Sequence, residues 1–157
     1  GVWLAPGSST QGAFQNVPPC RSAVQTGCVV AYNTYDDVPP RLSLFGRTVD
    51  GRTVVCVNPG DPSGGSARLD PIVPVPSSPG AVDVVGFASY PGSVAGRCRS
   101  NATSTWLEVT TTARSQLPER ALASQLSPAW GLHRVDITVA LGDLIDLASS
   151  QAAALAP

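Results

Sequence analysis

His133 is the only histidine in this sequence of 157 residues. Its segment, Trp130-Gly-Leu-His-Arg-Val-Asp136, lies between a turn and a predicted terminal helix. An imidazole titrates near neutral pH, and a loop that precedes a helix can present the ring to a cleft. His133 is therefore a candidate general base. A structural or surface histidine is the alternative, so a second residue of suitable chemistry is needed to distinguish the two.

The candidate acid that would orient this imidazole is an aspartate. Asp36 and Asp37 stand at the exit of a predicted strand, residues 28–35. In α/β-hydrolases the nucleophile, the acid and the histidine follow one another in that order along the chain, with the acid after a late strand. Asp36 followed by His133 fits this order, so Asp36 is the predicted acid, with Asp37 and Asp136 as alternatives. Adjacent aspartates are also ordinary turn residues, and Asp136 is better explained as the cap of the terminal helix.

No serine of the sequence has the context of a hydrolase nucleophile. That serine sits in a strained turn between a strand and a helix, with the pattern G-x-S-x-G. Residues 64–68 read GGSAR and lack the final glycine, and residues 92–96 read GSVAG with the serine one place early. A hydrolase site built on His133 would therefore need a nucleophile from another segment.

The cysteines form an even set without the paired spacing or the histidines that zinc requires. They are Cys20, Cys28, Cys56 and Cys98. Two disulfides are the expected arrangement, which implies an oxidising compartment and leaves no thiolate for catalysis. The short spacing suggests that Cys20 pairs with Cys28 and leaves Cys56 with Cys98, although spacing alone does not fix the connectivity.

The pattern of apolar residues predicts a mixed α/β chain that forms a single domain over residues 1–157. Four stretches rich in β-branched residues predict strands, at residues 28–35, 52–57, 82–88 and 105–111. Residues 117–126 predict a short helix, and apolar residues at steps of three or four predict an amphipathic helix from about 136 to 155. Prolines and glycines in residues 59–81 indicate a long loop or an insertion. So few strands suggest only part of an α/β sheet.

Composition narrows the partners that the chain is expected to have. Apolar residues make up 43% of the sequence and charged residues only 13%, with a net charge of −1. This balance favours a folded domain and gives no electrostatic reason to expect a nucleic acid or an anionic membrane surface as partner. No apolar run is long enough for a transmembrane segment, and no metal or cofactor motif is found. Since no signal peptide is present, export would depend on residues outside this sequence.

Three blocks of the sequence resemble a widespread family of bacterial α/β-hydrolases, often described as lysophospholipase-like or esterase-like. The blocks are PCRSAVQTGCVVAYNT at residues 19–34, VCVNP at residues 55–59, and GLHRVD at residues 131–136. They cover most of the chain in the order found in the family. The resemblance implies a partial α/β-hydrolase fold, and an upstream half that carries the serine elbow and several strands. It also implies that His133 shuttles the proton while an acid orients its ring.

The leading hypothesis is therefore that the chain is the carboxy-terminal part of a secreted or periplasmic serine ester hydrolase. Its partner would be an amino-terminal segment that carries the nucleophile, and its substrate a small ester or lipid. The chain alone would be inactive. The alternative is a non-catalytic extracellular module, in which the disulfides and proline-rich loops build a binding or structural surface.

Overall fold

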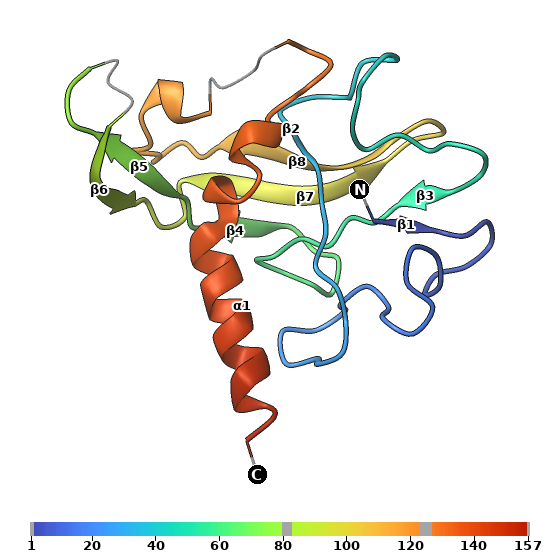
Figure 1. The fold of residues 1–157 in the computed structure, drawn as a ribbon. Helices are drawn as coiled ribbons and strands as arrows, with labels where there is room; N and C mark the ends of the chain where they lie inside the picture. The colour runs from blue at the N-terminus through green and yellow to red at the C-terminus, as the bar shows by residue number, and fades with distance from the viewer. Residues whose placement is uncertain (1, 80–82, 123–126, 157) are drawn as a thin grey trace.

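The computed structural model describes residues 2–79, 83–122 and 127–156, which form a largely β structure with one terminal α-helix (Figure 1). The main sheet has four strands in the order β2-β8-β7-β4. These strands are β2 (Thr34–Tyr35), β4 (Ala67–Leu69), β7 (Val94–Ser100) and β8 (Thr105–Thr111). Only β2 and β8 pair in parallel among these neighbours, and the other pairs are antiparallel.

Two small antiparallel ribbons accompany the main sheet. One pairs β1 (Trp3–Leu4) with β3 (Thr53–Val54), and the other pairs β5 (Ile72–Pro76) with β6 (Val84–Ser89). Residues 59–81, predicted as a loop or an insertion, thus contribute β4 to the main sheet and β5 to the second ribbon. The proline-rich run still forms a strand because β5 pairs only with β6, so its prolines need not donate hydrogen bonds on the other side.

The fold class predicted from the sequence, a partial α/β-hydrolase sheet, is wrong. An α/β sheet is mostly parallel and is covered by helices on both faces. Here one strand pair is parallel, and the described residues hold a single α-helix, α1 (Leu141–Ala153). The disulfides and the terminal helix, which belonged to the same prediction, are present.

The terminal helix is shorter than predicted, because residues 136–140 do not join it. Asp136 and Ile137 lie between the single turns η2 (His133–Val135) and η3 (Thr138–Ala140), and residues 138–140 form η3. The predicted helix 117–126 is represented by one turn, η1 (Glu119–Ala121), and residues 123–126 lie outside the described part. Three consecutive β-branched residues, Ile137 to Val139, disfavour an α-helix. The Thr138 hydroxyl also donates to the carbonyl of Val135, at 3.1 Å, and competes with helical hydrogen bonds.

The core lies between the main sheet and the segment that runs from the last turns into α1. Strand residues of this core include Leu69, Val94 and Leu107, which are fully buried. Leu132 and Val139 from the terminal segment pack in the same cluster and are almost completely buried. Burial of these side chains therefore fixes the terminal segment on the sheet, which determines where His133 lies.

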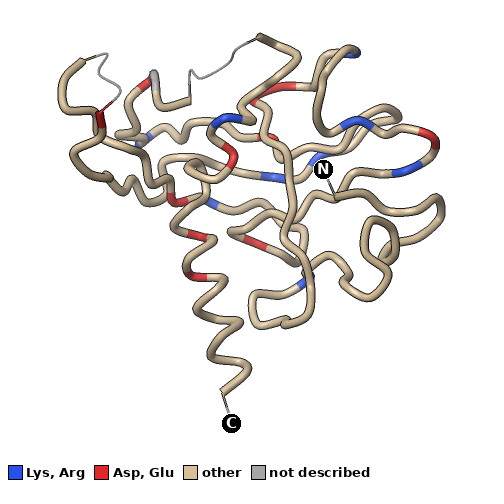
Figure 2. Tube along the Cα trace, viewed as in Figure 1, with Lys and Arg blue, Asp and Glu red and all other residues tan. Residues whose placement is uncertain are grey.

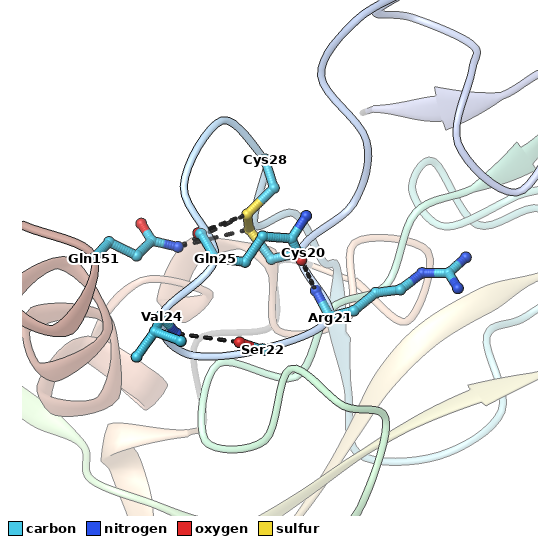
Figure 3. Close-up of a disulfide and its surroundings, with 7 residues drawn as sticks. All are labelled: Cys20, Arg21, Ser22, Val24, Gln25, Cys28 and Gln151. Atoms are coloured by element: carbon cyan, nitrogen blue, oxygen red, sulfur yellow. Dashed lines mark hydrogen bonds between the residues drawn. A yellow bond between two sulfur atoms is a disulfide. The ribbon is translucent and has the colours of Figure 1, made fainter. Parts of the chain in front are cut away.

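Both disulfides join the cysteines that the spacing suggested. Cys20 is bonded to Cys28, and Cys56 to Cys98. The Gln151 amide on α1 points at the first disulfide, with its nitrogen 3.7 Å from the Cys20 sulfur (Figure 3). The last turns of α1 extend beyond the sheet and carry no charged residue (Figures 1 and 2). The contact of Gln151 with the disulfide tethers them to the amino-terminal loops.

Charged residues are scattered along the chain (Figure 2). No described helix combines the length and the apolarity that crossing a bilayer would require.

Candidate functional site: a histidine and aspartate pair

His133 is placed by a tight turn that lies against β2. The amide of Leu132 donates to the carbonyl of Thr34 at 3.0 Å, which tethers the segment to the strand. Gly131 has a φ of +55°, and a Cβ atom there would lie 2.4 Å from the ring of Tyr35. Only glycine fits both the backbone conformation and the space, so the turn that presents His133 depends on it.

The imidazole of His133 is paired with the carboxylate of Asp136. The Nδ1 atom lies 2.6 Å from Oδ2 of Asp136, and the other carboxylate oxygen accepts a hydrogen bond from the Thr34 amide at 2.9 Å. Side-chain exposure is 39% for His133 and 12% for Asp136. The acid is therefore largely buried and held by two hydrogen bonds, while the ring that it orients is more accessible.

One aromatic ring stacks on the imidazole, and a second ring packs against the first. Phe45 stacks on His133 with ring centroids 3.7 Å apart and an angle of 26° between the planes. Trp130 meets Phe45 edge-on at 5.4 Å. With the ring stacked on Phe45 and Nδ1 bound to Asp136, the orientation of His133 is restricted in two directions.

Burial dominates the electrostatics of Asp136. It raises the pKa of this carboxyl above its usual value, and hydrogen bonds from Thr34 and His133 only partly oppose the effect. Tyr32 donates its hydroxyl to the backbone carbonyl of Asp136 at 2.9 Å. Burial, and then the charge of Asp136, raise the pKa of Tyr32, so its phenol stays protonated and remains a donor.

A mostly apolar hollow of about 440 Å³ borders the pair. Its lining residues are Val30, Ala31, Tyr32, His133, Asp136, Ile137 and Leu144. Ile137 is 64% exposed beside the ring. This surface suits an apolar group held next to the imidazole.

Asp36 and Asp37, the predicted acid and its neighbour, lie elsewhere. Both are exposed, and they line a separate small hollow with Pro128 and Gly131. The carboxylate within hydrogen-bonding distance of His133 is that of Asp136, which the sequence suggested as a helix cap. Side chains three residues apart eclipse one another in a 3₁₀ turn, so the spacing His-x-x-Asp was the signal for this pair.

In the described part of the chain, no hydroxyl or thiol is hydrogen-bonded to His133. Within residues 2–79, 83–122 and 127–156, Asp136 is the one side chain recorded in a hydrogen bond with His133. All four cysteines are in disulfides. No group of three or more metal-ligating side chains occurs among the described residues.

Comparison of the chain with family models, with curated proteins and with solved structures found no match. The resemblance to bacterial hydrolases therefore remains a prediction, and any functional argument depends on the geometry of the site.

Proposed function

We propose that this chain supplies the histidine and the acid of a serine ester hydrolase whose nucleophile lies on a different polypeptide segment. The observation that carries the proposal is the contact of 2.6 Å between His133 Nδ1 and Asp136 Oδ2. An ionised Asp136 accepts the proton of Nδ1, so the neutral ring has its lone pair on Nε2. That is the tautomer that a general base in acyl transfer requires.

The chemistry follows from this tautomer. Nε2 of His133 takes the proton of the serine hydroxyl while the hydroxyl oxygen attacks the ester carbonyl carbon. The protonated ring, stabilised by Asp136, then gives that proton to the departing alcohol oxygen. A water molecule repeats the two steps and releases the acid. The apolar hollow beside the pair would hold the acyl chain.

The proposal also includes export. Two disulfides persist in oxidising compartments, which favours a secreted, periplasmic or cell-envelope location. This location can be tested by treating whole cells with a thiol-reactive reagent that does not cross membranes. The treatment is made before and after reduction of disulfides. The four cysteines should become reactive from outside only after reduction.

A fluorophosphonate probe, which reacts with activated serines, tests the site itself. The protein is isolated from the cells that produce it, labelled, and digested to locate the modified serine. We expect the label on a serine outside these 157 residues, in a segment joined to or bound by this chain. Variants His133→Ala and Asp136→Asn should slow labelling by about 10² to 10⁴, the range for loss of general-base catalysis.

Two further variants make the test specific. Asp83→Asn alters an exposed carboxylate outside the site and should label at the parental rate. Asp36→Asn distinguishes the two candidate acids: a loss of labelling with Asp36→Asn but not with Asp136→Asn would overturn our assignment. Equal labelling in His133→Ala and the parent would contradict the hydrolase and favour the non-catalytic module.

A further inference from the structure

A second hollow, of about 380 Å³, is lined in part by Phe45, the ring that also stacks on His133. It is lined by β1, by Asn33 just before β2, and by residues 43–54, which run from the loop around Phe45 through a turn into β3. Its lining includes Trp3, Asn33, Phe45, Arg47, Arg52 and Val54. The hollow therefore combines aromatic and aliphatic walls with two arginines.

Arg47 and Arg52 are exposed and bring positive charge to the hollow. Among the described residues, Arg99 forms an ion pair with Glu108, and the contact of His133 with Asp136 is an ion pair only when the ring is protonated; neither contact involves Arg47 or Arg52. Asp50 lies in the turn between the two arginines and makes no ion pair with them. Guanidinium groups in this situation favour an oxyanion, which they can bind through two parallel hydrogen bonds.

One of these arginines is already held in place. The guanidinium carbon of Arg52 lies 4.5 Å from the centre of the Trp3 ring. A cation stacked on an indole loses less conformational freedom when it binds a ligand than a free side chain does. Trp3 thus both orients Arg52 and contributes an aromatic wall to the hollow.

Asn33 adds a neutral polar group to the hollow. The residue is only 5% exposed, and it lines the hollow. Its side-chain amide makes no hydrogen bond to a described residue, and its atoms are not among the fully buried atoms that lack a partner, so the amide keeps some access to solvent. A polar group bound in the hollow can therefore accept a hydrogen bond from it.

We propose that this hollow is a binding site for a small oxyanion carried on an apolar body, such as a carboxylate or phosphate with a short alkyl chain. Arg47 and Arg52 bind the oxyanion, the amide of Asn33 donates to it, and Trp3, Phe45 and Val54 contact the apolar part. Because Phe45 also stacks on His133, a ligand in the hollow lies one ring away from the imidazole. The proposal concerns binding and does not depend on the proposed hydrolysis.

Calorimetric titration of the chain with hexyl phosphate tests the site, with inorganic phosphate and hexanol as the two halves of the ligand. We expect hexyl phosphate to bind more tightly than either, and binding to weaken as salt is added. Titration with hexanoate then shows whether a carboxylate or a phosphate is preferred. The proposal is supported if hexyl phosphate or hexanoate binds more tightly than hexanol. The proposal would be overturned if inorganic phosphate bound as tightly as hexyl phosphate. It would also be overturned if hexanol bound as tightly as hexyl phosphate or hexanoate.

Variants then locate the ligand. Arg47→Gln and Arg52→Gln should each weaken hexyl phosphate binding by about ten-fold, the usual effect of losing a hydrogen bond to a charged group. Arg114→Gln removes an exposed arginine outside the hollow and should bind like the parent. In NMR spectra of the parent, the indole signal of Trp3 should shift with ligand. Parental affinity in both hollow variants, or equal loss in Arg114→Gln, would contradict the assignment.

Discussion

At the scale of single residues, the site depends on how Asp136 is buried. Its carboxylate is held between the ring of His133 and the backbone amide of Thr34, with little access to water. A buried charge of this kind is unfavourable for folding but favourable for orienting an imidazole. The charge of Asp136 thus lowers the stability of the fold, while the same carboxylate provides a fixed hydrogen-bond acceptor for the ring of His133.

The dependence of stability on pH should reveal this cost. A carboxyl whose pKa is raised in the folded protein contributes stability below its unfolded pKa, about 3.9, and loses it as the pH rises through the folded value. In Asp136→Asn no charge forms, so the variant should gain free energy of unfolding relative to the parent as the pH rises above about 4. Urea unfolding of both proteins across acid and neutral pH measures the difference.

Asp143 provides a second case, because burial also raises its pKa while it accepts the amide of Asp70 at 2.8 Å. Asp143→Asn should show the same direction of change. A difference between variant and parent that is constant with pH would contradict the account for either residue.

Gly131 is the residue on which the turn before His133 depends. Gly131→Ala should destabilise the protein by about 2 to 4 kcal/mol, because a left-handed backbone and overpacking against Tyr35 both oppose a side chain. Gly27 has a similar φ of +66° but open space at its Cβ position. Gly27→Ala should therefore cost only about 1 to 2 kcal/mol, and equal losses in the two variants would rule out the contact with Tyr35 as a cause.

At the scale of elements, local patterns predicted some structures and failed for others. Residues 105–111 were predicted as a strand and form β8, since their β-branched residues and Trp106 pack in the centre of the sheet. The neighbouring strand β7 was missed because Gly96 and two arginines break its apolar alternation. Its position depends on pairing with β8 over seven residues, which is a tertiary effect.

The predicted strands at residues 28–35 and 52–57 shrink to two residues each, β2 and β3. Both stretches are extended, but they pair with irregular segments for most of their length. The Ala31 carbonyl, for example, accepts the amide of Val57 outside any named strand. Sequence patterns identify an extended chain more easily than the partner that completes a ladder.

The candidate site was predicted only in part, for the same reason. His133 was predicted as the base because it is the one histidine of the sequence. The spacing His-x-x-Asp was compatible with Asp136 as the partner of the ring and with Asp136 as a helix cap. That choice depended on where the terminal helix begins. The β-branched run before α1 delays its start to Leu141 and leaves Asp136 directly after the 3₁₀ turn η2, where its carboxylate contacts His133.

At the scale of the whole molecule, one disulfide joins a loop to the main sheet and the other closes a short loop near the amino terminus. Cys56–Cys98 joins the loop after β3 to β7 and spans 42 residues, whereas Cys20–Cys28 spans 8. In the chain-entropy model the longer link stabilises by about 4 kcal/mol and the shorter by about 2.5 kcal/mol. The fold therefore depends more on Cys56–Cys98.

Paired serine variants test this ranking. Cys56→Ser with Cys98→Ser should lower the free energy of unfolding more than Cys20→Ser with Cys28→Ser, measured by denaturant titration. The second pair also loses the contact with Gln151, so Gln151→Ala in the parent is the matched control for that contribution. A larger loss in the Cys20 and Cys28 variant, after this correction, would contradict the ranking.

The central claim is that Asp136 fixes His133 with its proton on Nδ1 and its lone pair on Nε2. Because the chain has a single histidine, nitrogen NMR of the ¹⁵N-histidine-labelled protein gives one pair of ring signals, without ambiguity of assignment. For the neutral form of the ring, we predict a protonated Nδ1 and an unprotonated Nε2, with the preference lost in Asp136→Asn. A ring protonated on Nε2 in the parent, or one unchanged by Asp136→Asn, would contradict the account.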